Sequence, residues 1–269
     1  MPPTDQTLLC GIARTAMEIV SDLLRRDQDH AGSVRSASTS STQLFREETI
    51  TEQLVSRLVE EYPDHVKLTL FTPPEEAAIG ADWYWQIRRG PFALHALVQA
   101  KRVRRTTLGG DDQAGVVEID RDQLFNLRNN RLVFSRKMPG LQSWLVTYAR
   151  FGAVPPCGAV PCECAHHGCS ACPRDLIPSI WAQPVDDIVQ KLKFETNSVP
   201  VRDIVEESVR LDCVVPCVQP LLLGGQKFGP AIKGIVMSGD VPDFRRMVTT
   251  IRRDQELASQ LAGAFLISA

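Results

Sequence analysis

The chain has 269 residues, with 30 Lys and Arg against 32 Asp and Glu, so its formal net charge is −2. This length suits one large domain or a domain with additions, and the near-neutral charge excludes a global basic field that would attract nucleic acid. No apolar run approaches the ~18 residues of a membrane span, and we find no signal-peptide pattern, so we expect a cytoplasmic protein with no membrane partner.

Hydrophobic periodicity divides the chain into a leading helix, a central α/β unit and a less regular final third. Apolar residues recur at helical spacing over 4–26, and the polar stretch 27–42 predicts a linker, so we expect the first helix to be an appendage. The central unit is predicted as a helix (43–62), three strands (65–71, 81–87, 93–103), a helix (121–137) and a strand (144–148), with a turn-rich loop at 72–79. This order predicts an α/β sandwich with helices on the faces of the sheet.

The final third begins with a segment, 155–173, that is dense in Cys, Pro and Gly. Helices are predicted over 185–194, 201–211 and 244–261, and a strand over 233–237. The domain organisation that we expect is an N-terminal helix and linker (1–42), an α/β core (43–150), and a Cys-rich segment with a helical C-terminal region (151–269).

Polar residues cluster where two neighbouring predicted strands meet. Asp82 lies at the start of one strand, and Gln99 and Lys101 lie two residues apart near the end of the next. Residues at i and i+2 on a strand point to the same face, so a carboxylate, an amide oxygen and an ammonium can converge at the sheet edge. Such a group can hold a hard divalent cation and polarise a water beside it. The pattern therefore indicates hydrolysis of a phosphodiester.

Two short motifs carry a family resemblance. The sequences Gly-Ala-Asp-Trp-Tyr-Trp (80–85) and Gln-Ala-Lys-Arg (99–102), in this order of elements, resemble the PD-(D/E)xK nuclease superfamily, which has the restriction-endonuclease-like fold. The Gln of the second motif is similar to the Mrr-type branch and to nuclease domains of bacterial anti-phage effectors, although Ala81 stands where the family has Pro. The resemblance covers roughly residues 43 to 150 and implies an αβββαβ core, here with a cysteine-rich insertion and helical additions.

The resemblance also implies roles for individual residues. Asp82 would bind Mg²⁺ or Mn²⁺, Gln99 would offer its carbonyl oxygen where most members have Glu, and Lys101 would orient the attacking water or stabilise the developing phosphorane charge. An acidic residue on the first core helix would complete the metal site. Glu48 is our choice, with Glu47 as the alternative. Because Gln99 removes one negative charge from the site, phosphate of the nucleic acid would supply part of the missing charge.

A basic run follows the site directly. Arg102, Arg104 and Arg105 lie where a phosphate backbone would approach, and they are our candidates for nucleic-acid contact; a solvated basic face is the alternative. DNA is the expected partner, ahead of RNA. Trp83 and Trp85 share the opposite strand face from the metal-binding Asp, and we expect them in the core rather than as base-stacking platforms.

Cysteines form the second cluster. The candidate ligands are Cys162, Cys164, Cys169 and Cys172, with Cys157, His166 and His167 close by. Thiolates and imidazoles this close in a Pro- and Gly-rich segment suit a tetrahedral structural Zn²⁺, which could also order a loop of low apolar content. A reduced metal-free loop, or disulfides in an oxidising compartment, are the alternatives.

Two functions follow from these patterns. The first is a Mg²⁺-dependent nuclease, with DNA endonuclease activity favoured and a role in bacterial defence suggested by the resemblance alone. The second is a catalytically inactive module that binds nucleic acid or presents a zinc-stiffened protein-interaction surface. Gln99 and the lack of global positive charge favour the second.

Overall fold

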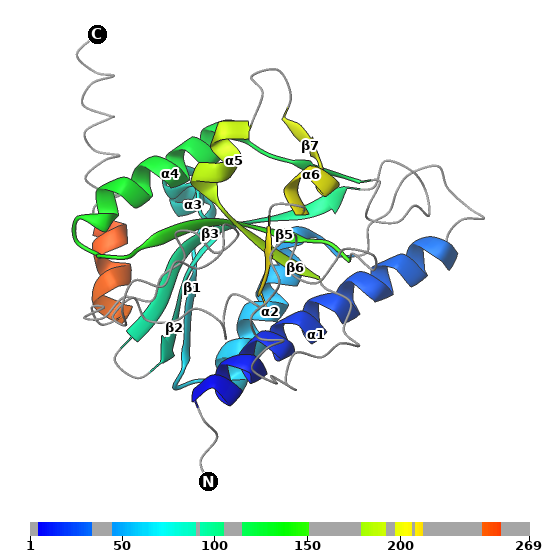
Figure 1. Ribbon diagram of the computed structural model, residues 1–269, viewed down its shortest axis with the longest axis horizontal. Helices are drawn as coiled ribbons and strands as arrows, with labels where there is room; N and C mark the ends of the chain where they lie inside the picture. The colour runs from blue at the N-terminus through cyan, green and yellow to red at the C-terminus, as the bar shows by residue number, and fades with distance from the viewer. Residues whose placement is uncertain are drawn as a thin grey trace, which may run out of the picture.

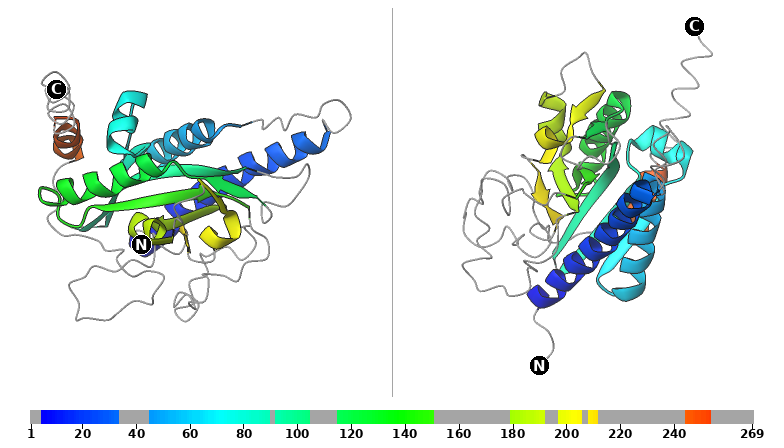
Figure 2. Two further views of the ribbon diagram at one scale, coloured as in Figure 1. Left: turned by 90° about the horizontal axis from the view of Figure 1, so that it is seen from above. Right: turned by 90° about the vertical axis from the view of Figure 1, so that its right-hand side faces the viewer.

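The computed structural model describes residues 5–33, 45–89, 92–104, 115–150, 179–191, 197–205, 208–211 and 244–253. These residues form a mixed α/β fold, in which one mixed sheet lies between layers of helices (Figures 1 and 2). The α/β class predicted from the sequence is therefore confirmed. The predicted strand 233–237 and the cysteine-rich segment lie outside the described residues.

The elements follow one another closely along the chain. The first two thirds contain α1 (Asp5–Ser33), α2 (Glu47–Glu61), β1 (Val66–Leu70), α3 (Pro73–Ile79), β2 (Trp83–Arg89), β3 (Phe92–Arg104), β4 (Val116–Glu118), α4 (Arg121–Ser135) and β5 (Gln142–Tyr148). The last third contains β6 (Ile180–Pro184), α5 (Val185–Lys191), β7 (Ser198–Pro200), α6 (Val201–Val205), β8 (Val209–Arg210) and a helix over 244–253.

The sheet is built around the long strand β3. Its strands run in the order β1-β2-β3-β5-β6-β8, and β4 pairs with β3 and with β7. The pair β3–β5 is parallel, whereas β1–β2, β2–β3, β5–β6 and β6–β8 are antiparallel. The parallel pair is joined by a crossover that contains α4, as parallel strands require. β3 is paired with β2 over residues 92–98 and with β5 over residues 96–102, so Gln99 and Lys101 lie beyond the pairing with β2.

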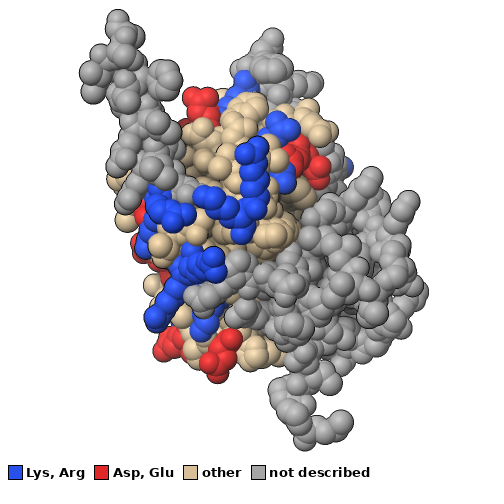
Figure 3. Space-filling view, turned by 90° about the vertical axis from the view of Figure 1, so that its left-hand side faces the viewer, with Lys and Arg blue, Asp and Glu red and all other residues tan. Residues whose placement is uncertain are grey.

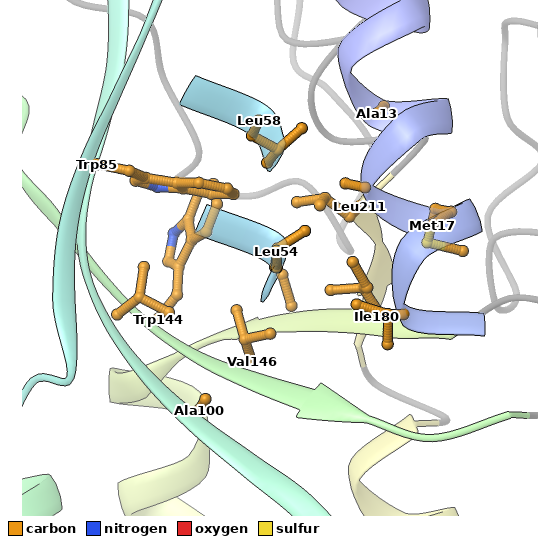
Figure 4. Packing of buried hydrophobic residues seen from close by; sticks show 14 of the residues in the cluster. Ala13, Met17, Leu54, Leu58, Trp85, Ala100, Trp144, Val146, Ile180 and Leu211 are labelled. Carbon is orange, nitrogen blue, oxygen red and sulfur yellow. The ribbon is translucent and has the colours of Figure 1, made fainter. Parts of the chain in front are cut away.

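One face of the sheet is covered by α1 and α2 (Figure 2), whose buried apolar residues share one cluster with Trp83 and Trp85. Figure 4 shows Trp85 beside Trp144 and Leu58 in this cluster. Trp83 and Trp85 are only 1% and 3% exposed. The rings of Trp85 and Trp144 pack edge to face, with their centroids 5.4 Å apart. α4, α5, α6 and the 244–253 helix cover the opposite face around a second apolar cluster that includes Tyr84 and Leu97. The core prediction for both tryptophans is confirmed.

The expectation that the first helix is an appendage with a linker from residue 27 is wrong. α1 continues to Ser33, and it buries one side of its length in the same core as the sheet. The buried residues are Ile12, Ala13, Ala16, Met17, Val20 and Leu24. The polar composition after residue 26 was misleading because Asp27 is itself buried, at 2% exposure, by an ion pair with β3.

The turn-rich loop predicted at 72–79 is also wrong, because these residues form α3. Thr72 caps the helix in a capping box with Glu75, Pro73 occupies its first turn, and Gly80 ends it in the left-handed conformation. The predicted helix 201–211 is correct only for its first turn, since Val209–Arg210 forms strand β8. Of the helices that the structure describes, none combines the length and hydrophobicity needed to traverse a bilayer.

Candidate metal centre

The candidate centre forms where β3 extends past the start of β2. Pairing between the two strands begins at Trp83 and Val98, and the amide of Asp82 donates to the Val98 carbonyl at 2.8 Å. Further along the same edge of β3, the amide of Ala100 donates to Asp82 Oδ2. The amide of Arg102 donates to Glu47 Oε2 at 2.9 Å. Two carboxylates, one from the residue just before β2 and one from the start of α2, thus accept hydrogen bonds from alternate backbone amides along one edge of β3.

Lys101 completes the charged part of the centre. Its ammonium lies 3.6 Å from Glu47 Oε1, and the two side chains are 16% and 25% exposed. The ion pair is therefore sheltered from solvent but not sealed, as a site that admits a ligand requires. Glu47 reaches it because α2 begins at this residue, which places the first helical turn above the end of β3.

Gln99 adds a polar group that has no partner within the described part of the protein. Its side chain is fully buried, and neither Nε2 nor Oε1 forms a hydrogen bond there. Continuing the β2–β3 register by one residue places Asp82 opposite Gln99, so both side chains share a sheet face. On β5, Thr147 is the register partner of Lys101, and its hydroxyl is also buried without a described partner. Because burying polar groups without hydrogen-bond partners is costly, binding of a ligand or an ordered water next to Gln99 and Thr147 would be favourable.

The two carboxyl groups have perturbed acidities. Burial raises the pKa of Glu47, and the ammonium of Lys101 and the amide of Arg102 only partly oppose that rise. The pKa of Asp82 is raised well above its usual value, first by burial and then by the negative charge of Glu47. Burial also raises the pKa of Tyr148, with both carboxylates contributing. A cation shared by the carboxylates would favour their ionised forms and offset this repulsion.

Glu47, rather than Glu48, is the helix acid of this centre. Both begin α2, but Glu48 points to solvent while Glu47 contacts Lys101 and the Arg102 amide. These contacts favour the alternative, Glu47, over Glu48, the acid chosen from the sequence. The two residues are about 100° apart around the helix axis, so a one-residue difference decides which carboxylate faces the sheet. Sequence boundaries do not resolve that difference.

The basic run has a different arrangement from the one expected. Arg102 does not face a substrate backbone, because it is 9% exposed and pairs with Asp27 of α1. Alternation along β3 turns Arg102 to the face opposite Lys101, a signal that was readable in the sequence. Arg104 is exposed and pairs with Glu118 of β4. Arg105 lies outside the described residues.

The proposed zinc ligands also lie outside the described residues, so no geometry is assigned to them. They are Cys157, Cys162, Cys164, His166, His167, Cys169 and Cys172. Where the chain is described, no group of three or more His, Cys, Asp and Glu side chains lies close enough to hold a metal ion. The centre at β3 has two carboxylates with an amide, a donor set of the kind that suits Mg²⁺ when water and substrate phosphate supply the remaining ligands.

Comparison with known families gives the chain a place. Residues 15–221 match the model of a family of unknown function, DUF6615. The chain belongs to the DUF6615 family. The matched region contains Glu47, Asp82, Gln99 and Lys101, and it ends before the 244–253 helix. No curated protein matches the chain, and DUF6615 membership assigns it no activity.

Proposed function

We propose that this protein is a metal-dependent nuclease that hydrolyses phosphodiester bonds, with DNA favoured over RNA. The observation that carries the proposal is the pair of partly buried carboxylates, Glu47 and Asp82, held beside Lys101 and the amide of Gln99, which has no hydrogen-bond partner among the described residues. The resemblance of residues 80–85 and 99–102 to PD-(D/E)xK nucleases supports it. The order α2, β1, β2, β3, α4, β5, with α3 and β4 as additions after β1 and β3, also supports it, because it fits a restriction-endonuclease-like core.

The residues of the centre fit Mg²⁺ or Mn²⁺ as a resident ion. Glu47 and Asp82 would hold it, and the buried Gln99 carbonyl oxygen, which lacks a described partner, would add a neutral ligand. When bound, the ion would activate a water and stabilise the oxygen that leaves. A site with two carboxylates and one ammonium carries a net charge of −1 before the ion binds, so the ion and a substrate phosphate would leave it nearly balanced.

Lys101 would supply the positive charge that comes from the protein itself and not from the metal ion. Its ammonium is held beside Glu47 at the partly open end of the site, where it can orient a water and attract the phosphoryl oxygens. No other side chain of the described centre carries a positive charge toward that end, because Arg102 is turned to the opposite face. Lys101 would therefore stabilise negative charge as it develops on the phosphorus.

Basic residues elsewhere could hold the backbone of a long substrate. The helix 244–253 contains four arginines and no acidic residue, and Met247 and Ile251 anchor it to the core. Figure 3 shows Lys and Arg side chains gathered on the side of the molecule where this helix lies in Figure 1. Such a face attracts nucleic acid through counterion release, independently of base sequence.

A cleavage assay tests the proposal. Single- and double-stranded DNA and RNA are incubated with Mg²⁺, Mn²⁺ or EDTA and the wild type, Asp82→Ala or Lys101→Ala. Glu52→Gln, an exposed acid on α2, is the matched control. We expect cleavage that requires a divalent ion, falls to background in the two site variants and is retained in the control. Equal cleavage by wild type and both site variants would contradict the proposal.

The second candidate is an inactive module on the same fold, which binds nucleic acid or presents a zinc-stiffened surface to another protein. Gln99 favours it, since an amide replaces the carboxylate that most resembling nucleases carry. Salt-sensitive binding without cleavage in either metal would support nucleic-acid binding. Zinc measured in the purified protein, and lost with Cys162→Ser and Cys164→Ser, would support the stiffened surface.

A further inference from the structure

α1 is fastened to the candidate centre through a buried ion pair. The guanidinium of Arg102 pairs with Asp27, and their side chains are 6% and 2% exposed. The same guanidinium donates to the carbonyl of Phe45, and Asp27 Oδ1 accepts from the amide of Phe45 at 3.3 Å. Both backbone groups of Phe45 are thus held, two residues before Glu47.

Arg102 links these contacts of Asp27 and Phe45 to the carboxylate of Glu47. Its side chain binds Asp27 and Phe45, while its backbone amide binds Glu47 Oε2 at 2.9 Å. The neighbouring residue of α1 repeats the attachment, because Gln28 accepts from Arg150 at the end of β5 at 2.6 Å. One turn of α1 therefore spans the ends of two parallel strands at the point where α2 begins.

Among the described residues, the start of α2 is also held by the buried Ile50 and by the hydroxyl of Thr51, which bonds to that of Tyr148, but not by a side-chain cap. Its N-cap residue, Arg46, makes no side-chain capping bond, in contrast to Asp120 of α4, whose carboxylate accepts from the amide of Gln123. Helix N-termini without caps leave amide groups unsatisfied and fray. The position of Glu47 then depends on the contacts made just ahead of the helix, which are those of Asp27 and Arg102.

We infer that Asp27 is a positioning residue of the metal centre: through Arg102 and Phe45 it fixes the carboxylate of Glu47 over the end of β3. The inference rests on the proposed function, in which Glu47 holds a divalent ion. Groups that orient metal ligands from behind typically contribute about 10- to 100-fold to metal affinity or activity. α1 is thereby part of the working site, although it contributes no group that touches the ion.

The test separates positioning from support of the fold. Asp27→Leu combined with Arg102→Met replaces the pair by apolar side chains, a change that often preserves or raises stability. The Arg102 backbone amide stays available to Glu47. We expect urea unfolding like that of the wild type, Mn²⁺ affinity by calorimetry and kcat both lower by about 10- to 100-fold, and an unchanged KM for the nucleic acid. Asp29→Asn, on an exposed turn of the same helix, is the matched control and should resemble the wild type.

Amide hydrogen exchange of Phe45 and Ile50 gives a readout that needs neither metal nor cleavage. We expect faster exchange at both amides in Asp27→Asn, a variant that keeps the shape of the side chain if the double variant does not fold. Unchanged exchange together with unchanged Mn²⁺ affinity would overturn the role of Asp27. If Glu47→Gln abolishes cleavage while the Asp27 variants retain it, the positioning role fails and the nuclease proposal stands. If the wild type neither binds Mn²⁺ nor cleaves, the nuclease proposal fails instead.

Discussion

Gly80 is a residue at which a single added methyl group should destabilise the packing next to the candidate centre. It ends α3 with φ at +82°, and it lies two residues before Asp82. A Cβ added there would lie 2.1 Å from the carbonyl oxygen of Gln123 and 2.5 Å from the amide nitrogen of Leu127, both in the backbone of α4. Because backbone atoms cannot turn aside as a flexible side chain does, α3 and α4 would have to separate.

The magnitude follows from two contributions. The left-handed backbone costs a residue other than Gly about 1–2 kcal/mol, and forced separation of packed elements costs about 1–3 kcal/mol. Gly80→Ala should thus lower the free energy of unfolding by about 2–5 kcal/mol, a large part of the 5–15 kcal/mol typical of a folded protein. With an m-value of about 3 kcal/mol/M, the urea midpoint would fall by about 1 M.

A second glycine provides the control in the same assay. At Gly11 of α1 an added Cβ would lie 3.4 Å from the hydroxyl of Tyr62, which is ordinary contact, and the position is helical. Gly11→Ala should leave stability unchanged or raise it by up to about 1 kcal/mol through helix propensity. An unfolding free energy for Gly80→Ala within about 0.5 kcal/mol of the wild type would refute the close contact between Gly80 and the backbone of α4.

Three further predictions concern charge. Glu47→Gln should abolish divalent-dependent cleavage and Glu48→Gln should retain it; the reverse result in the same assay would restore the acid chosen from the sequence. Without metal at pH 8, Asp82→Asn should raise the unfolding free energy by about 0.5–2 kcal/mol, because it removes a buried charge repelled by Glu47; a lower urea midpoint would contradict this. Burial lowers the pKa of His95 from 6.5 to about 4. Between these two pH values the unfolded chain therefore binds more protons than the folded one. The stability that neutral His95 contributes is complete above pH 6.5 and is lost as the pH falls toward 4. The loss should reach about 3 kcal/mol in the wild type and be absent from the pH–stability curve of His95→Gln; parallel wild-type and variant curves would refute it.

The sequence predicted the regular part of the fold because its period was clear. The alternation of apolar residues in β1, β2 and β3 and the spacing in α4 place each element within about two residues of its observed bounds. The sequence prediction for 72–79 is a loop and not α3, although Thr72, Glu75 and Gly80 are ordinary start and stop signals of a helix. Short helices depend on caps rather than periodicity, so only a search for caps would have found it.

The centre was predictable in part. Spacing alone brought Asp82, Gln99 and Lys101 to one strand end, because strand alternation is a local rule. Which acid of α2 faces them depends on the rotation of a helix about its axis, and that is determined by packing on residues distant in sequence. The pair of Asp27 with Arg102 joins residues 75 positions apart. Asp27 lies in a segment whose composition resembles a linker, and Arg102 lies in a basic run that resembles a phosphate contact. Neither segment alone therefore indicates that the two residues pair.

The claim on which the account depends is that Glu47 and Asp82 share a divalent cation. Crystals of the wild type and of Asp82→Asn, soaked in Mn²⁺ and measured for anomalous scattering, test it most directly. We expect an anomalous peak from Mn²⁺ bonded to carboxylate oxygens of Glu47 and Asp82 in the wild type, and no such peak in the variant. A peak that persists in Asp82→Asn, or a wild-type centre that stays without one at saturating Mn²⁺, would contradict it.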